Sequence, residues 1–295
     1  MQTLRIIVLL LCSLCCSGPA PAADDAATLR QKYAALTPQL SNNQFQRTLY
    51  LDSIESSSTI KGDIYAVMDY PFAGVNSVLN NPEHGPANWC DVMMLHPNTK
   101  YCRASSDSNG KKLNVNIGKK VRQTLAYSYP MEFSYQETAV SPEYFRVNLN
   151  SDSGPLGTRD YRIVLEAVAV DGKHTFLHLA YSCSYGMAGR TAMKIYLATI
   201  GSNKVGFTGT GLQSNGQPGY IGGLRGVVER NTMRYYLAID AYLSTFSLPA
   251  DKRLEKRLSN WFNATEQYAR QLHEVDRQEY MQMKYQEYLR RQTAQ

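Results

Sequence analysis

The sequence predicts an α+β domain in which an antiparallel sheet packs against one long helix near its C-terminal end. Three observations lead to this fold class. Segments that alternate polar and apolar residues recur from residue 47 onward, which is the pattern of half-buried strands. Short turns separate the middle segments, so consecutive strands pair as an antiparallel meander. Helical periodicity then extends over 221–246 and resumes at 251.

The composition is that of a globular protein with a sizeable core. The chain has 295 residues, of which 43% are hydrophobic and 19% charged, so a disordered, collagen-like or disulfide-dense chain is excluded. The net charge is +6, and no basic cluster with interleaved aromatic residues occurs, so we expect no nucleic-acid partner. The 21 tyrosines against 8 phenylalanines indicate aromatic side chains with a polar tip, which suit a wet cavity, a sheet surface or an interface.

Residues 1–23 have the pattern of an export signal. Arg5 gives a positive start, and the apolar run 6–16 is too short to span a bilayer. Ala20 and Ala22 fit the small-residue rule of signal peptidase, so we expect cleavage after Ala22 or Ala23. The mature chain would then be exported, periplasmic or secreted, without a transmembrane segment. An uncleaved anchor is the alternative.

Three of the six cysteines lie in this signal, and three remain in the mature chain. In an oxidising compartment two of the three should pair. Cys90 and Cys102 are the closest in sequence, so we predict a disulfide between them and a buried thiol at Cys183. No Cys-x-x-Cys spacing occurs, and we expect no metal site and no cofactor.

The first half of the chain is expected to contain a lead-in, two strands and two short helices. Residues 24–43 are a polar lead-in with a short helix near 26–36, and the domain itself is predicted over 44–247. Strands are predicted at 47–56 and 64–68. Helices are predicted at 72–79 and around Trp89 to Met93, and each is followed by a turn that contains a proline.

The middle of the chain is expected to form the meander. Asp171-Gly172 is the strongest hairpin signal, because both central positions of a two-residue turn need positive φ. A second hairpin is predicted through 201–204, between strands at 192–200 and 205–210, with 186–189 as a short connector before it. The other predicted strands are 113–117, 125–135, 144–149, 161–170 and 174–184.

Two helical segments complete the chain. A long helix is predicted over 221–246, which Pro249 ends. The extension 248–295 is predicted as one further amphipathic helix. Three interpretations of this helix are open: it packs back on the domain, forms a coiled coil, or binds a protein partner or a second copy of the chain through 251–290.

This order of elements resembles the helix-grip fold of the START-like superfamily, also called SRPBCC. The resemblance covers 44–246 and rests on Gly62-Asp-Ile-Tyr-Ala-Val before the helix pair, on Trp89, and on Arg225-Gly-Val-Val-Glu-Arg-Asn in the long helix. It implies a curved antiparallel sheet wrapped on the long helix, with an elongated cavity between them that holds a lipid or another hydrophobic small molecule. The chain departs from typical members through its export signal and its C-terminal extension.

Six residues are candidates for lining this cavity. Asn231, Arg234 and Tyr235 lie on the long helix and are expected to hold a ligand head group, although a salt-bridge face is the alternative. Trp89 and Met93 would line the cavity mouth or belong to the core. His178 is expected to face inward with its alternate neighbours Phe176 and Ala180. The candidate set is Trp89, Met93, His178, Asn231, Arg234 and Tyr235.

No catalytic signature is present, so we name no catalytic residue. The sequence contains neither His-Glu-x-x-His nor Gly-x-Ser-x-Gly, and its Gly-rich segment at 154–157 lacks the lysine of a phosphate loop. The first interpretation is therefore binding of a lipid or hydrophobic small molecule. One alternative is a cyclase-like or hydrolase-like enzyme in which His178 or Glu229 acts as acid–base. Another is an envelope interaction module that acts through the C-terminal helix.

Overall fold

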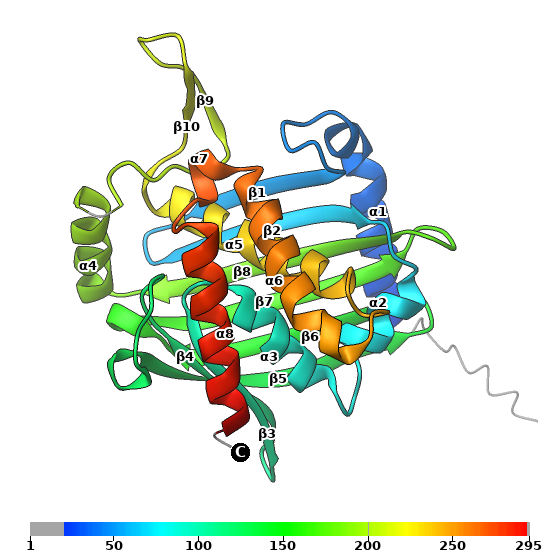
Figure 1. The fold of residues 1–295 in the computed structure, drawn as a ribbon. Coiled ribbons are helices and arrows are strands. Elements are labelled where there is room, and N and C mark those ends of the chain that lie inside the picture. Colours follow the sequence, from blue (N-terminus) through cyan, green and yellow to red (C-terminus); the bar gives the residue numbers. More distant parts are fainter. Residues whose placement is uncertain (1–20, 200, 294–295) are drawn as a thin grey trace, which may run out of the picture.

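The structure, a computed structural model, describes residues 21–199 and 201–293, and its centre is an eight-stranded antiparallel sheet (Figure 1). The strands are β1 (Leu49–Glu55), β2 (Thr59–Met68), β3 (Thr99–Asp107), β4 (Gly110–Ile117), β5 (Tyr129–Ser141), β6 (Tyr144–Ser153), β7 (Thr158–Ala169) and β8 (Thr175–Tyr185). Their order in the sheet is β1-β2-β8-β7-β6-β5-β4-β3. The predicted signal peptide lies outside the described residues except for 21–23.

Helices cover both faces of this sheet. Two short helices, α2 (Phe72–Leu79) and α3 (Gly85–Leu95), connect β2 to β3, and the long helix α5 (Gly223–Leu243) packs across β2, β1 and β8. We call the face under α5 the inner face. Helix α1 (Pro21–Ser41) packs on the opposite, outer face, behind the sheet in Figure 1. This arrangement confirms the predicted α+β fold with a helix-grip order of elements, to which β1 adds an edge strand.

Alternation along the strands divides the core in two. Successive side chains of a strand point to opposite faces of the sheet. Leu177 and Leu179 of β8 accordingly belong to the large cluster under α5, whereas Phe176 packs with Leu29 of α1 on the outer face. Gly62 lets α5 lie directly on β2, because a Cβ atom there would be 2.4 Å from the Thr232 hydroxyl oxygen.

The β7–β8 hairpin is present as predicted, but its turn is wider than the two-residue type. Gly172 does not adopt positive φ. The Asp171 carboxylate instead accepts hydrogen bonds from the N–H groups of Lys173 and His174, at 2.7 and 2.8 Å. A side chain that satisfies the turn backbone removes the need for left-handed residues.

The second predicted hairpin is wrong. Residues 192–198 belong to a helix, α4 (Met187–Ala198), and no described strand spans 201–208. This segment is rich in Ala, Met, Lys and Leu, which are strong helix formers. A small hairpin of β9 (Gly209–Leu212) and β10 (Pro218–Tyr220) follows and projects from the body (Figure 1). Two further differences are β3, which was not predicted, and the start of β5, which follows a short 3₁₀ turn, η1 (Leu125–Tyr127).

The C-terminal extension is three helices rather than one. They are α6 (Ala250–Glu266), the single turn α7 (Ala269–Leu272) and α8 (Arg277–Thr293), and α6 and α8 pack together (Figure 1). The break after α7 has a physical cause. The Leu272 and His273 carbonyls accept hydrogen bonds from Arg234 and Lys204, which replace helical bonds. Trp261 of α6 then stacks on Tyr280 of α8, with ring centroids 4.9 Å apart.

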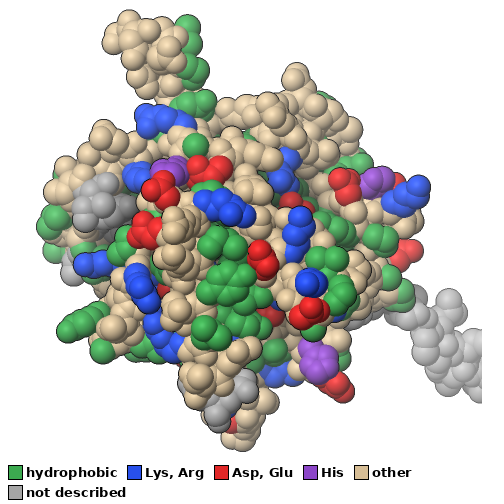
Figure 2. Space-filling view, viewed as in Figure 1, with side chains coloured by type: hydrophobic (Ala, Val, Ile, Leu, Met, Phe, Trp, Pro, Cys, Tyr) green, Lys and Arg blue, Asp and Glu red, His purple; other side chains and the backbone are tan. Residues whose placement is uncertain are grey.

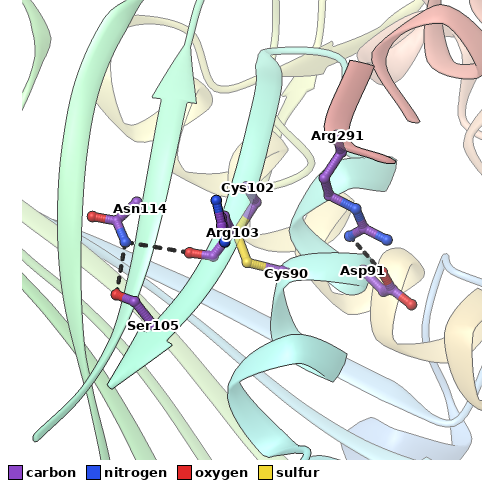
Figure 3. The surroundings of a disulfide bond; sticks show 7 residues. All are labelled: Cys90, Asp91, Cys102, Arg103, Ser105, Asn114 and Arg291. Carbon is purple, nitrogen blue, oxygen red and sulfur yellow. Dashed lines mark hydrogen bonds and ion pairs between the residues drawn. A yellow bond between two sulfur atoms is a disulfide. The ribbon is translucent and has the colours of Figure 1, made fainter. Parts of the chain in front are cut away.

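A disulfide and an ion pair tie α3 to its neighbours (Figure 3). Cys90 of α3 and Cys102 of β3 are bonded, as predicted, with their Cα atoms 5.2 Å apart, and Cys183 is a buried free thiol. The adjacent Asp91 carboxylate pairs with Arg291 of α8 at 2.6 Å and with an arginine of α6 at 2.9 Å. The extension is therefore attached to the same helix that carries the disulfide. No described helix is long and apolar enough to cross a membrane.

Candidate ligand-binding site

Three tyrosines face one another under α5. Tyr161 of β7 and Tyr181 of β8 meet edge to face at 6.2 Å, and Tyr181 stacks on Tyr235 of α5 at 5.6 Å between ring centroids. Each tyrosine keeps 8% of its surface accessible, whereas Leu165 and Leu179 on the same strands keep none. The three tyrosines are therefore buried, with slightly more accessible surface than these leucines. Their phenol groups combine an apolar body with a polar tip.

Asn231 and His96 form the polar end of this site. Asn231, one turn before Tyr235 on α5, interacts with the Tyr181 hydroxyl and with the His96 ring. His96 follows α3, stacks on Tyr235 at 5.1 Å, and accepts a hydrogen bond at Nδ1 from the N–H of Asn98. Burial and the nearby charges of arginine and lysine residues lower the pKa of His96, so the ring is neutral.

The neutral His96 ring has a spare donor. Because Nδ1 accepts a hydrogen bond, the ring proton is on Nε2. Nε2 is buried, and among the described residues it has no hydrogen-bond partner of good geometry. Such a donor is costly to leave unsatisfied, so it favours a ligand atom or water that accepts from it.

A cluster of charges adjoins His96. The carboxylate of Glu274, in the turn between α7 and α8, contacts Lys120 at 2.5 Å, Arg234 at 2.5 Å and Lys204 at 3.1 Å. Burial alone would raise the pKa of Glu274, but Arg234 and Lys120 outweigh it and lower that pKa to about 2. Burial and the charge of Arg234 lower the pKa of Lys120 to about 7. We call Lys120, Lys204, Arg234 and Glu274 the Glu274 cluster.

Two small hollows lie near the C-terminal helices rather than under α5. The larger, of about 20 Å³, lies between α3, α6 and α8, and the smaller, of about 10 Å³, lies beside Glu274 and Val275. Each has room for roughly one water molecule. Figure 2 shows hydrophobic side chains gathered in the middle of this face, over α6 and α8, with charged side chains around them. Neither hollow is the elongated cavity that the resemblance implied, because side chains pack closely between the sheet and α5.

Two of the six candidate residues lie in the core. Trp89 is fully buried and its indole N–H donates to the Leu79 carbonyl at 3.0 Å. Met93, one turn later on α3, is 1% exposed. Of the three candidates on the long helix, Asn231 and Tyr235 border the tyrosine site, and Arg234 belongs to the adjoining Glu274 cluster.

His178 lies on the outer face and not on the face under α5. His178 lies on the same face of β8 as Phe176, which packs against α1. The prediction that these two residues share a face is therefore correct, but the prediction that this face points inward is wrong. The Nε2 atom of His178 contacts Asp63 at 2.7 Å and its Nδ1 contacts Glu166 at 2.9 Å. Burial alone would lower the pKa of His178, but hydrogen bonds to the two carboxylates outweigh it and raise that pKa. The ring also stacks on Tyr65 at 4.3 Å.

Glu229, the other acid–base candidate, is fully buried and used in hydrogen bonds. Its carboxylate accepts from the Phe207 N–H, from the N–H and hydroxyl of Thr208, and from the Ser53 hydroxyl. Arg225, one turn earlier on α5, donates to the Ser53 hydroxyl, which in turn donates to Glu229. Glu229 therefore fixes the connector before α5 to β1, and no oxygen of it is aimed at the tyrosine site.

Sequence reasoning missed several residues of the site. Tyr161 and Tyr181 lie in predicted strands, at the alternate positions that share a face with the core leucines, so the alternation could have found them. His96 was noted only as part of a turn. Lys120 and Glu274 are 154 residues apart, and no local pattern brings them together.

Among the comparisons with known proteins, only the search of solved structures found similar chains. No family model matches the sequence, and no curated protein matches it. Similar solved structures include human StAR-related lipid transfer protein 5, with 8% identity over 76% of this chain and 97% of that chain, at a TM-score of 0.38. An aromatase/cyclase from Streptomyces has 10% identity over 72% and 95%, at 0.32. Norcoclaurine synthase from Thalictrum flavum has 11% identity over 50% and 91%, at 0.34.

These neighbours are START-like proteins, which is the group that the sequence resembles. The identities and TM-scores are low, so the likeness concerns the arrangement of strands and helices alone. No ligand or reaction of these proteins is transferred to this chain.

Proposed function

We propose that this protein is exported and binds a lipid or another hydrophobic small molecule between the sheet and α5. The observation that carries the proposal is the tyrosine site. Tyr161, Tyr181 and Tyr235 each keep 8% of their surface accessible in the middle of the fold, whereas Leu165 and Leu179 on the same strands keep none. Apolar walls with a few polar groups that fix orientation are the usual composition of a small-molecule site.

The spare hydrogen-bonding groups support the same proposal. Among the described residues, the Tyr235 hydroxyl has no hydrogen-bond partner, and His96 Nε2 has none of good geometry. A ligand oxygen that accepts from His96 Nε2 satisfies a polar atom that is otherwise buried at a cost, and one near Tyr235 gains a hydrogen bond from its hydroxyl. Binding of a larger molecule requires side chains under α5 to move apart, because they now fill most of this space.

Exposed apolar residues at one end of the sheet suit the entry of such a ligand. Leu156, in the short turn η2 (Pro155–Gly157), is 65% exposed, and Met187 and Ile195 of α4 are 88% and 61% exposed. α4 packs against η2, so these residues belong to neighbouring segments. The hydroxyl of Thr158, directly after η2, is 2.7 Å from that of Tyr161, which connects this end to the tyrosine site.

The enzyme alternative has less support. His178 lies on the other face of the sheet and Glu229 is occupied by four hydrogen bonds, so neither is placed to act on a ligand under α5. The interaction-module alternative requires an available face on the extension, yet α6 and α8 bury Trp261, Phe262 and Tyr280 against the domain.

Native mass spectrometry and thermal unfolding test the proposal. Gently purified protein should carry added mass that organic solvent removes, and a total lipid extract should raise its melting temperature. Tyr235→Phe should weaken binding of the extracted compound by about tenfold, the effect of one lost hydrogen bond. Tyr144→Phe is the matched control, because that hydroxyl bonds Glu166 on the outer face. Protein that is reproducibly empty and insensitive to lipid extract would refute the proposal.

A further inference from the structure

The Glu274 cluster differs from an ordinary buried salt bridge in its composition. Three cationic side chains from three separate segments share the oxygens of one carboxylate. Lys120 precedes β5, Lys204 follows α4, and Arg234 is on α5. Arg230, one turn before Arg234, donates to the Val205 carbonyl and adds a further positive charge beside Lys204. Among the described residues, the ion pairs of this site join three cations to one carboxylate, and Lys204 and Arg234 also donate to the His273 and Leu272 carbonyls.

A second buried cluster in the same protein shows what a permanent arrangement looks like. Lys100 and Lys284 share Glu287, and their remaining protons go to backbone carbonyls, those of Pro97 and Val121 for Lys100, and those of His96 and Thr99 for Lys284. These lysines are at most 1% exposed. In the Glu274 cluster the side chain of Lys120, 20% exposed, has Glu274 as its hydrogen-bond acceptor among the described residues. That lysine depends on the anion, whereas Lys100 does not.

The cluster is continuous with the tyrosine site. Arg234 precedes Tyr235 on α5, and the charges of Arg234 and Lys120 act directly on the His96 ring that stacks on Tyr235. The Nε2 donor of His96, which has Asn231 nearby but no hydrogen-bond partner of good geometry among the described residues, is buried in the same region. An acidic group at this position would sit at the polar end of the space under α5, with the rest of the molecule toward the tyrosines.

We propose that Lys120, Lys204 and Arg234 form a binding site for the acidic head group of the ligand, a carboxylate or phosphate, and that Glu274 occupies this site when no ligand is bound. This assignment rests on the proposed function and names the ligand class as an anionic amphiphile. The Glu274 side chain can move away from the cations, because it lies in a non-helical turn and 12% of its surface is exposed. Helices α6 and α8 stay anchored by the Trp261–Tyr280 stack and by Lys284.

The carboxylate of Glu274 competes with an external anionic ligand for the same three cations. A ligand binds only the fraction of molecules in which the cations are available, so the intramolecular carboxylate lowers the apparent affinity by that fraction. Removing Glu274 should therefore raise affinity for an external anion while it lowers the stability of the empty protein. An ordinary structural ion pair would show only the second effect.

Chemical rescue of a Glu274 variant separates these possibilities. Glu274→Ala is titrated with sodium acetate, inorganic phosphate and laurate, and thermal unfolding is followed, with sodium chloride at matched ionic strength. Glu266→Ala is the matched control, because Glu266 is a carboxylate of the same extension that pairs with His273 outside the cluster. Acetate or phosphate should restore the melting temperature of Glu274→Ala and leave the control unchanged. Laurate should bind Glu274→Ala at least about tenfold more tightly than it binds the unaltered protein.

Each outcome decides one of the two proposals. Rescue by acetate with no further gain from laurate supports the anion site and refutes the apolar ligand. Rescue by phosphate alone identifies a phosphate head group. If laurate binds both proteins equally and acetate rescues neither variant, the tyrosine site stands and the anion site is refuted. Should Glu274→Ala not fold, Glu274→Gln takes its place in the laurate titration, because its single amide oxygen accepts from fewer of the cations and it carries no charge that competes with an external anion.

Discussion

The two faces of the sheet each bury a small charged cluster, and the shared central group is a base in one cluster and an acid in the other. On the outer face one imidazole, that of His178, lies between the carboxylates of Asp63 and Glu166. On the inner side one carboxylate, that of Glu274, lies among three cations. The same attraction operates in both, so their difference lies in which elements supply the charges.

The outer cluster is fixed by the sheet itself. His178 of β8 is directly opposite Glu166 of β7 and Tyr65 of β2, and Asp63 is two residues along β2 from Tyr65 on the same face. Lys61 and Tyr144 complete it by bonding Asp63 and Glu166. The inner cluster is assembled from a loop, a connector, a helix and a turn. A cluster whose side chains are all fixed by strand register is rigid. In a cluster that includes a turn, the side chain from the turn can move away and a ligand group can take its place.

The largest expected effect is on the inner cluster. Glu274→Gln should lower the free energy of unfolding by about 3 kcal/mol at pH 7, because its pKa of about 2 lies below the ordinary 4.5. A depressed carboxyl pKa stabilises above pH 4.5, and this stability is lost as the pH falls from 4.5 to 2. Urea unfolding at pH 7 and at pH 2 should therefore show a difference from the unaltered protein only at the higher pH.

The control for this comparison is Glu266→Gln. Glu266 pairs with the half-exposed His273, so the variant should lose less than about 1 kcal/mol. Equal losses of unfolding free energy in the two variants would mean that the three cations around Glu274 stabilise the protein no more than the single exposed pair of Glu266.

A smaller loss is expected on the outer face. His178→Ala should lower the free energy of unfolding by about 2 kcal/mol at pH 6, because it leaves two buried carboxylates without their shared donor. The sign of the pH dependence is opposite to that of Glu274. The pKa of His178 is raised, so its contribution is complete below pH 6.5 and is lost as the pH rises through the raised value. The difference in urea unfolding between this variant and the unaltered protein should therefore shrink at alkaline pH, where only the neutral ring's hydrogen bond and its stacking on Tyr65 remain.

His174→Ala is the matched histidine variant. His174 pairs with Asp171 in the exposed β7–β8 turn, so its removal should cost about 0.5 kcal/mol or less. A loss as large as that of His178→Ala would show that burial between two strands adds nothing to the outer cluster.

The contrast between locally fixed and distantly assembled features also explains which parts of the fold could be predicted from the sequence. Alternation and turn residues are local, so the predicted strands at 144–149, 161–170 and 174–184 and the helix pair correspond to β6, β7, β8, α2 and α3. The Cys90–Cys102 bond was within reach because the two residues are 12 apart. Alternation does not say which face is inward, and His178 was therefore placed on the wrong side. The segment 192–200 was also predicted as a strand, although 192–198 belong to the helix α4.

The site was predictable only where it lies on one element. Asn231 and Tyr235 are one turn apart on α5, and helical spacing places them on one side. Lys120 and Lys204 reach Glu274 only because the extension turns back after α7, and this turn depends on tertiary hydrogen bonds from Arg234 and Lys204 themselves. A pattern that exists only in the folded state leaves no local trace in the sequence.

The smallest expected effect is at the edge of the outer face. Arg30 of α1 pairs with Glu143 in the turn between β5 and β6, and the two side chains are 42% and 66% exposed. Arg30→Ala should change the free energy of unfolding by about 0.5 kcal/mol or less, because solvent screens exposed pairs. A double-mutant cycle with Glu143→Ala, followed by urea unfolding at low and high salt, measures the coupling. α1 is held mainly by the apolar contacts of Leu29, Leu36 and Leu40 with Phe176. Charged pairs on the outer face should therefore stabilise the fold only where the strands bury them. A coupling above about 1 kcal/mol would contradict that division between a buried, register-fixed cluster and a screened surface pair.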